Sequence, residues 1–203
     1  MLGRARFLSD AGYSIMLFDF QAHGESAGER ITFGHLESND AQAPVDFLRA
    51  ILPDEKIGVI GVSMGGAAVT LASPPLEADA MVLEMVYPTI SEAVSNRLTM
   101  RLGGWSSALT PLLVWQFKIR LGIDAGKLRP VDKVGNISAV KLFVAGAEDQ
   151  HTTLRESIQL FNAAREPKEF WAVKDAGHVD LHKSSKEEYE RRILSFFDRY
   201  LRL

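Results

Sequence analysis

One serine in this chain stands where it could act as a nucleophile. Residues 61–65, GVSMG, fit the pattern G-x-S-x-G around Ser63. In this nucleophile-elbow pattern the serine occupies a strained turn between a strand and a helix, and glycines beside it avoid collisions with the neighbouring elements. About one chain in fifteen of this size would match by chance. Here, however, an apolar run precedes the match and small residues suited to a helix follow it, so the context favours a nucleophile over an incidental serine.

The predicted helix after Ser63 begins at Met64. The first N–H groups of a helix have no acceptor within the helix, and they lie beside the serine oxygen. We therefore expect the backbone N–H of Met64 to bind the oxyanion that forms when a serine attacks a carbonyl.

A serine hydroxyl becomes nucleophilic when a base takes its proton and an acid orients that base. Asp149 follows an apolar run at 141–145, and His178 follows another at 169–173. We expect Ser63, His178 and Asp149 to form a catalytic triad. The order serine, acid, histidine along the chain is one of the known orders for this arrangement.

Other residues compete for the same roles. The rival acids are Glu148, beside Asp149, and Glu84, at the end of another apolar run. The rival histidines are His151 and His182. Two further polar residues, Asp19 and His23, are expected to shape their own loop and not to transfer protons.

These residues need a scaffold that brings them to one place. Apolar runs that predict strands lie at 12–20, 56–61, 80–85, 141–145 and 169–173, and patterns that predict helices lie at 2–11, 33–51, 63–72, 154–164 and 186–201. Parallel strands joined by helices form a sheet that is covered on both faces. The expected class is therefore α/β with a mostly parallel sheet, and the three candidate residues follow strands at its carboxyl edge, where ligands bind.

Two details of the helices complete this prediction. In the helix at 33–51 we expect Phe47, Leu48 and Ile51 to face inward and Pro44 to kink the helix. Residues 87–138 break the alternation with a helix at 90–102 and a Leu-, Trp- and Phe-rich stretch at 105–121. That stretch is either ordinary core or an apolar cap over the active site.

Length and composition limit the number of domains and the kinds of partner that the protein can have. The chain has 203 residues, of which 46% are hydrophobic, and this suits one domain over residues 1–203 with a helical insertion at about 87–138. The net charge of −3 disfavours nucleic acid as a partner, and no run is long enough for stable membrane insertion. The absence of cysteine fits a soluble, cytoplasmic protein. No motif has the spacing of a metal site, so we expect neither a metal nor a cofactor.

The motifs together resemble the α/β-hydrolase superfamily, specifically the serine-hydrolase branch of bacterial esterases, lysophospholipase-like and serine-aminopeptidase-like proteins. Residues 19–26, DFQAHGES, are similar to the loop D-x-R-G-H-G-x-S of that branch, with Gln-Ala in place of Arg-Gly. Residues 61–66, 146–149 and 177–178 carry the rest of the resemblance. It implies the triad roles of Ser63, Asp149 and His178, and it implies that the insertion is a lid.

The amino terminus departs from that family. Members begin with two antiparallel strands and a third that ends in a His-Gly loop, which supplies the second oxyanion donor. Nothing of this kind precedes Met1, so the fold is expected to be N-terminally shortened, with a slot in the sheet. Either residues 13–20 fill the slot and pair with 56–61, or a second copy covers the exposed edges, and we expect a homodimer. A start assigned too far downstream would explain the same gap.

The leading hypothesis for function is a serine carboxylesterase that cleaves small-molecule esters with short- to medium-chain acyl groups through an acyl-enzyme. Thioesters, monoacylglycerols and peptides are less favoured substrates. A haloalkane-type reaction is disfavoured, since it needs a carboxylate at position 63. Because the second oxyanion donor is missing, the alternative is a catalytically impaired α/β-hydrolase fold that serves as a binding or assembly module.

Overall fold

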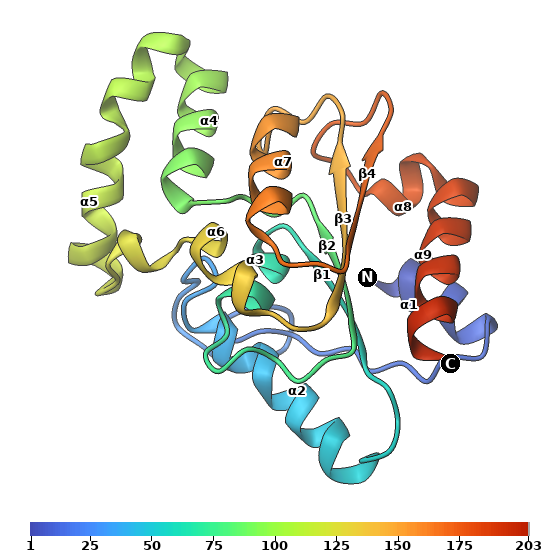
Figure 1. The fold of residues 1–203 in the computed structure, drawn as a ribbon. Coiled ribbons are helices and arrows are strands. Elements are labelled where there is room, and N and C mark those ends of the chain that lie inside the picture. The colour runs from blue at the N-terminus through green and yellow to red at the C-terminus, as the bar shows by residue number, and fades with distance from the viewer. Residues whose placement is uncertain (203) are drawn as a thin grey trace.

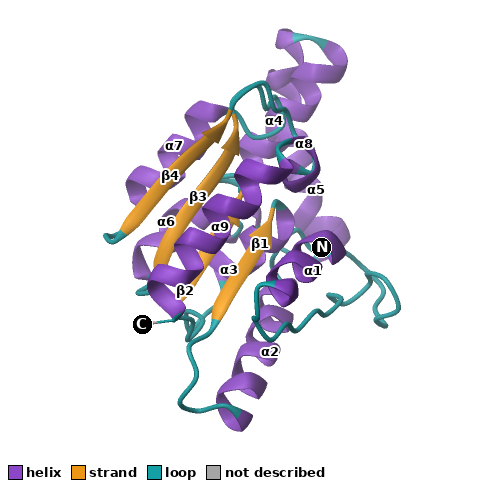
Figure 2. Cartoon of the chain, turned by 90° about the vertical axis from the view of Figure 1, so that its right-hand side faces the viewer, coloured by secondary structure: helices purple, strands orange, loops and turns teal. Residues whose placement is uncertain are grey.

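The computed structural model describes residues 1–202, and a twisted parallel sheet forms its centre (Figures 1 and 2). The 4-stranded sheet has the order β1-β2-β3-β4. Its strands are β1 (Gly58–Val62), β2 (Ala80–Glu84), β3 (Val140–Gly146) and β4 (Lys168–Val173). All neighbours are parallel, so every strand ends at the same edge. The predicted α/β class is confirmed.

Helices cover both faces of the sheet, as Figure 1 shows. One face carries α1 (Leu2–Asp10), α8 (Leu181–Ser184) and α9 (Lys186–Leu201). The other face carries α2 (Glu37–Ile51), α3 (Met64–Leu71), α6 (Pro130–Lys133) and α7 (Leu154–Ala163). No helix within residues 1–202 is both long and apolar enough to cross a bilayer.

The core is divided by the sheet into two clusters. Along β2 the side chains alternate between them: Ala80 and Val82 pack with α1 and α9, whereas Met81 and Leu83 pack with α2 and α3. Successive side chains of a strand point to opposite faces. Because both faces are covered, every residue of β2 is buried, and this explains why the strand is apolar until Glu84.

A helical hairpin stands away from the sheet in the region predicted as an insertion (Figure 1). It comprises α4 (Ile90–Leu102), the 3₁₀ helix η1 (Gly104–Leu109) and α5 (Thr110–Leu121). The short 3₁₀ helices η2 (Ala125–Lys127) and η3 (Val134–Asn136) lead back to β3. No residue of α5 is fully buried, but Val114, Phe117 and Leu121 are half-buried and pack against the core. The Trp-rich stretch is therefore joined to the core along one side only.

The predicted strand at 12–20 is wrong. Residues 13–20 carry no strand hydrogen bonds, and the side chains from Ile15 to Phe18 are exposed. Within the described residues, β1 pairs with β2 alone, so residues 13–20 do not fill a slot beside it. An apolar run becomes a strand only when a neighbouring strand supplies hydrogen-bond partners, and here none lies beside this run.

The helix predicted at 33–51 begins later and faces differently. Glu37 accepts hydrogen bonds from the N–H groups of Thr32 and Gly34, which closes a turn before α2 starts. Phe47 and Ile51 are each 54% exposed, contrary to the prediction, and the helix buries Ala41 and Val45 instead. Pro44 lies inside α2 without ending it.

Candidate active site

Ser63 lies at the turn from β1 into α3, at the carboxyl edge of the sheet. Its backbone has φ of 49° and ψ of −114°. A positive φ is uncommon for a residue with a side chain and marks local strain. The N–H of Ser63 donates to the carbonyl oxygen of Glu84 at 2.7 Å, so the end of β2 holds this strained turn in place.

Two glycines allow β1 and α3 to approach closely at the turn. A Cβ on Gly61 would lie 2.6 Å from the Cα of Gly66, and one on Gly66 would lie 2.2 Å from Cγ2 of Val86. A Cβ on Gly65 would lie 3.5 Å from the Phe20 ring, an ordinary contact. The predicted crowding is thus present at Gly61. The second position that has no room for a side chain is Gly66 and not Gly65, the last residue of the motif.

The structure brings together the three side chains expected to form a triad. Oγ of Ser63 lies 3.2 Å from Nε2 of His178, and Nδ1 of His178 lies 2.7 Å from Oδ2 of Asp149. The hydroxyl and the carboxylate therefore contact opposite nitrogens of one imidazole. If Nδ1 carries the proton and donates it to Asp149, Nε2 is free to accept a proton from the serine.

The loop after β3 fixes the carboxylate of Asp149. Its side chain is fully buried, and its Oδ1 accepts hydrogen bonds from the N–H groups of His151 at 2.7 Å and Thr152 at 3.0 Å. The loop after β4 lies against it, because the N–H of Glu148 donates to the carbonyl of Ala176 at 2.9 Å. These contacts leave Oδ2 directed at His178.

His151, a rival histidine, lies beside the site and not in the hydrogen-bond chain. Its ring centroid is 5.0 Å from that of His178. Burial, with Arg97 and His178 nearby, lowers the pKa of His151 below its ordinary value. The lowered pKa of His151 and its place beside His178 could not be predicted from the sequence, because Arg97 comes from the distant helix α4.

His182, the second rival histidine, and the two residues expected to shape their own loop make contacts elsewhere. His182 Nε2 lies 2.8 Å from Glu190, and His23 Nδ1 lies 2.8 Å from the carbonyl of Gln21 within its own loop. Asp19 accepts a hydrogen bond from Ser26 through its carbonyl, which agrees with the expected loop-shaping role.

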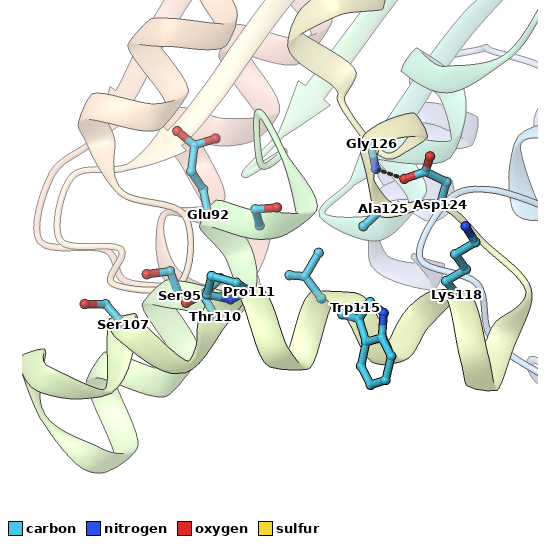
Figure 3. Close-up of a pocket in the computed structure, with 12 residues that line it drawn as sticks. Glu92, Ser95, Ser107, Thr110, Pro111, Trp115, Lys118, Asp124, Ala125 and Gly126 are labelled. Atoms are coloured by element: carbon cyan, nitrogen blue, oxygen red, sulfur yellow. Dashed lines mark hydrogen bonds between the residues drawn. The ribbon is translucent and has the colours of Figure 1, made fainter.

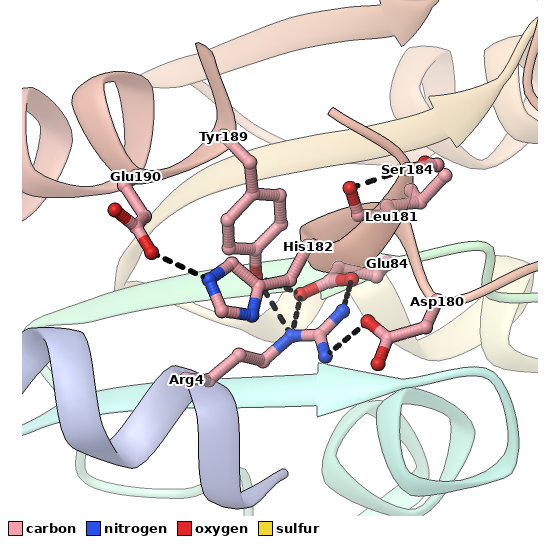
Figure 4. Close-up of polar contacts among 8 residues, drawn as sticks. All are labelled: Arg4, Glu84, Asp180, Leu181, His182, Ser184, Tyr189 and Glu190. Carbon is pink, nitrogen blue, oxygen red and sulfur yellow. Dashed lines mark hydrogen bonds and ion pairs between the residues drawn. The ribbon is translucent and has the colours of Figure 1, made fainter. Parts of the chain in front are cut away.

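Glu84, the rival acid, belongs to a buried ionic cluster behind the elbow (Figure 4). Arg4 of α1 donates to both of its carboxylate oxygens, at 3.0 and 2.7 Å, and also to the hydroxyl of Tyr189 at 2.9 Å and to Asp180 at 2.8 Å. The carboxylate and the hydroxyl hold the charge on Arg4, so the pKa of its guanidinium is raised despite burial. This cluster connects the strand end that holds Ser63 with the segment just after His178. The sequence indicated this cluster only through Glu84, a carboxylate at the end of an otherwise apolar strand.

A cavity of about 680 Å³ lies in the hairpin and not at Ser63. Figure 3 shows its lining along α5, with Trp115 and Lys118, and at the turn from Asp124 to Gly126. None of the three predicted catalytic residues lines it. This cavity is therefore not a pocket around the candidate nucleophile.

A sequence profile described as the alpha/beta hydrolase family matches residues 2–192. The chain belongs to this family. It is 24% identical to the uncharacterized protein YqkD of Bacillus subtilis over 195 residues, which is 93% of this chain and 63% of that protein. It is 28% identical to the uncharacterized protein Rv2307c of Mycobacterium tuberculosis over 178 residues, 85% of this chain and 56% of that one. The chain thus spans less than two thirds of the curated relatives it matches.

Solved structures of this hydrolase family share the fold. The esterase Pf2001 of Pyrococcus furiosus superposes with a TM-score of 0.79 at 25% identity, covering 99% of this chain and 76% of that one. A monoacylglycerol lipase of Paleococcus ferrophilus superposes with a TM-score of 0.65 at 23% identity, covering 95% of this chain and 88% of that one. The neighbours of this alpha/beta hydrolase in fold therefore include an esterase and a lipase.

Proposed function

We propose that the protein is a serine hydrolase that cleaves carboxylic esters, a carboxylesterase. The observation that carries the proposal is the hydrogen-bond chain from Oγ of Ser63 through His178 to Oδ2 of Asp149, with distances of 3.2 and 2.7 Å. Nucleophile, base and orienting acid are within the reach that acyl transfer by a serine requires. The esterase among the structural neighbours agrees with this reaction class.

In the proposed reaction Oγ of Ser63 attacks the ester carbonyl while its proton moves to Nε2 of His178. The carbonyl oxygen becomes an oxyanion, which the N–H of Met64, first residue of α3, binds. Collapse of this intermediate breaks the bond to the alcohol, which leaves with the proton from His178. Water, deprotonated by His178, then attacks the acyl-enzyme, and the acid is released as the proton returns to Ser63. Asp149 remains ionised and stabilises the imidazolium.

Short- to medium-chain acyl esters are the proposed substrates, and residues 87–138 are the proposed lid. In support of this, α4 contacts the loop that carries Asp149, since Nδ2 of Asn96 donates to the carbonyl of His151 at 3.2 Å. The same amide binds Glu156 at 2.8 Å. A displacement of the hairpin would therefore disturb the backbone of the loop that carries Asp149, the acid of the proposed triad.

A fluorophosphonate probe, which forms a bond to an activated serine, tests the proposal. We expect the wild type to be labelled and Ser63→Ala to be unlabelled, and we expect a chain-length panel of p-nitrophenyl esters to give its highest kcat/KM at short or medium acyl groups. Ser26→Ala serves as a matched control, because Ser26 is exposed and its hydroxyl donates to the Asp19 carbonyl, away from the candidate triad. A folded wild type that neither reacts with the probe nor cleaves esters would instead support a binding or assembly module.

Two further proposals concern the state of the protein. We propose a homodimer formed through the free edge of β1, since unpaired strand edges invite pairing. Light scattering that finds only monomer at micromolar concentration would rule this out. We also propose a cytoplasmic location, with which a chain free of cysteine is compatible. Cell fractionation tests it.

A further inference from the structure

The outward surface of the hairpin exposes large apolar side chains to an unusual degree. Trp105 is 68% exposed, Trp115 59% and Ile119 63%. We define the apolar hairpin surface by six exposed side chains: Leu102, Trp105, Leu109, Leu112, Trp115 and Ile119. Exposed apolar residues are normal when scattered singly, but a group of this kind marks an interaction site.

Three of these side chains share one face of α5. Leu112, Trp115 and Ile119 follow one another in α5 at intervals of three and four residues, which places them on one helical face. The opposite side of α5 is used inside the molecule, where Phe117 stacks on Phe33 with ring centroids 5.3 Å apart. The helix α5 therefore has two apolar faces: one packs inside the molecule, and the other, with Leu112, Trp115 and Ile119, is exposed.

The hairpin is also basic, whereas the rest of the chain is acidic. Residues 90–121 contain Arg97, Arg101, Lys118 and Arg120 against the single acid Glu92, a net charge of +3 in a chain of −3. The remaining residues therefore carry −6. Arg101, Lys118 and Arg120 are exposed, and none of the three forms an ion pair within residues 1–202. Lys118 lies three residues after Trp115 in α5, a spacing that makes the two side chains neighbours on the helix surface, so this cation borders the apolar surface. Arg101 lies at the end of α4, where the apolar surface begins with Leu102.

We propose that the apolar hairpin surface docks onto an anionic lipid bilayer. Tryptophan is favoured at the boundary between headgroups and acyl chains, and cations beside it are attracted to anionic lipids. A second copy of the chain fits less well, because symmetric pairing of this surface would bring like charges together. The contact is peripheral and uses only the outward side chains. It does not depend on the proposed esterase activity.

Vesicle co-sedimentation tests the docking. We expect the wild type to bind phosphatidylcholine vesicles that contain phosphatidylglycerol, and to bind pure phosphatidylcholine much more weakly. Each surface cation contributes about 1 kcal/mol, or roughly fivefold in affinity, so Arg101→Gln/Lys118→Gln should weaken binding to the anionic vesicles about 25-fold. Raising the salt concentration should release the wild type from the anionic vesicles, since salt screens the attraction between the cations of the protein and the lipid headgroups.

The apolar part has its own variants and a matched control. Trp105→Ser/Trp115→Ser should weaken vesicle binding about tenfold or more, whereas Phe47→Ser should leave it unchanged, because Phe47 is 54% exposed but lies on α2. Fluorescence provides a second readout. The emission of Trp105 and Trp115 should shift to shorter wavelength on binding, while Trp171, which is buried in the wild type, should not respond in the double variant.

Several results would overturn the proposal. These are no binding to anionic vesicles at low salt, equal binding to neutral and anionic vesicles, and equal loss of binding in Phe47→Ser. Circular dichroism establishes that each variant is folded, which the exposure of the replaced side chains leads us to expect. A dimer in light scattering that Trp105→Ser/Trp115→Ser dissociates would assign the surface to a second copy instead.

Discussion

Replacement of Arg4 by methionine should be one of the most damaging single substitutions in this protein. The side chain of Arg4 is 5% exposed, and that of Glu84 is fully buried. Without the guanidinium, the carboxylate of Glu84 keeps only the hydroxyl of Tyr189 as a partner among the contacts shown in Figure 4. An unpaired buried charge of this kind typically costs about 3–5 kcal/mol. A protein of this size loses roughly 2–4 °C in Tm per kcal/mol, so a loss of about 6–20 °C is expected.

Urea unfolding monitored by circular dichroism measures this loss, with Arg6→Met as the matched control. Arg6 lies in the same helix and is exposed, so its replacement should change the free energy of unfolding by less than about 0.5 kcal/mol. The double variant Arg4→Met/Glu84→Gln removes the orphaned charge and should recover about 2 kcal/mol or more of the loss. It also keeps a hydrogen-bonding side chain beside Tyr189.

The reasoning fails if Arg4→Met costs less than about 1 kcal/mol, because the cluster would then be no more stabilising than a surface ion pair. It also fails if the double variant is less stable than Arg4→Met, since the damage would then come from lost packing and not from the charge on Glu84. A result in which Arg4→Met and Arg6→Met are equal would show that the methylenes of the arginine side chain are all that α1 needs.

Three other substitutions give distinct outcomes. Asp149→Asn should stay folded but lower kcat by about 10⁴, because the imidazole loses its orienting acid; ester hydrolysis measures this, and a loss under tenfold would contradict it. Gly66→Ala should cost about 1–3 kcal/mol in urea unfolding, whereas Gly65→Ala should not, given the clearances of their added Cβ atoms. Burial lowers the pKa of Lys141 from 10.5 to about 8, so below pH 8 the folded state bears the full penalty of its charge. Between those values the unfolded chain holds a proton that the folded chain has released, and wild-type stability should rise by about 3 kcal/mol relative to Lys141→Met; parallel stability curves for the two proteins would refute this.

The sheet was largely predictable because its central strands, β2 and β3, are buried on both faces. A strand such as β3 is apolar at nearly every position, and that pattern needs no knowledge of neighbours. The places of Ser63, Asp149 and His178 followed from the same reasoning, since each comes just after a strand, and parallel strands end at a common edge. The sequence therefore anticipated the convergence of residues that are far apart along the chain.

Predictions failed where the structure depends on a partner from elsewhere. Residues 13–20 have the composition of a strand, but a strand exists only through its neighbours. Phe47 and Ile51 looked like core residues, yet α2 buries the smaller Ala41 and Val45 in one cluster with residues of α3. Leu48 packs against that cluster, as predicted. Apolarity alone does not reveal which side of a helix the rest of the molecule will cover.

The ionic cluster was also missed, for a related reason. A buried arginine in α1 reads as an ordinary surface residue, because its partner Glu84 is 80 positions away in sequence. The sequence also could not show that glycine is required at position 66 and not at 65. The side chain that an added Cβ at 66 would hit belongs to Val86, a residue beyond the next strand. Such contacts are set by three-dimensional proximity and leave little trace in local pattern.

The distance in sequence between the serine and its base has a consequence for biosynthesis. Ser63 and His178 are separated by 115 positions, and the histidine belongs to the loop between β4 and α8. Ribosomes add about 5–20 residues per second, so the elbow exists for roughly 6–23 s before its imidazole has been made. A nascent chain that has not reached residue 178 thus carries the Ser63 hydroxyl without this imidazole. If His178 is the base that activates Ser63, as proposed, the serine stays unreactive toward acyl groups until that residue has been made and folded into place.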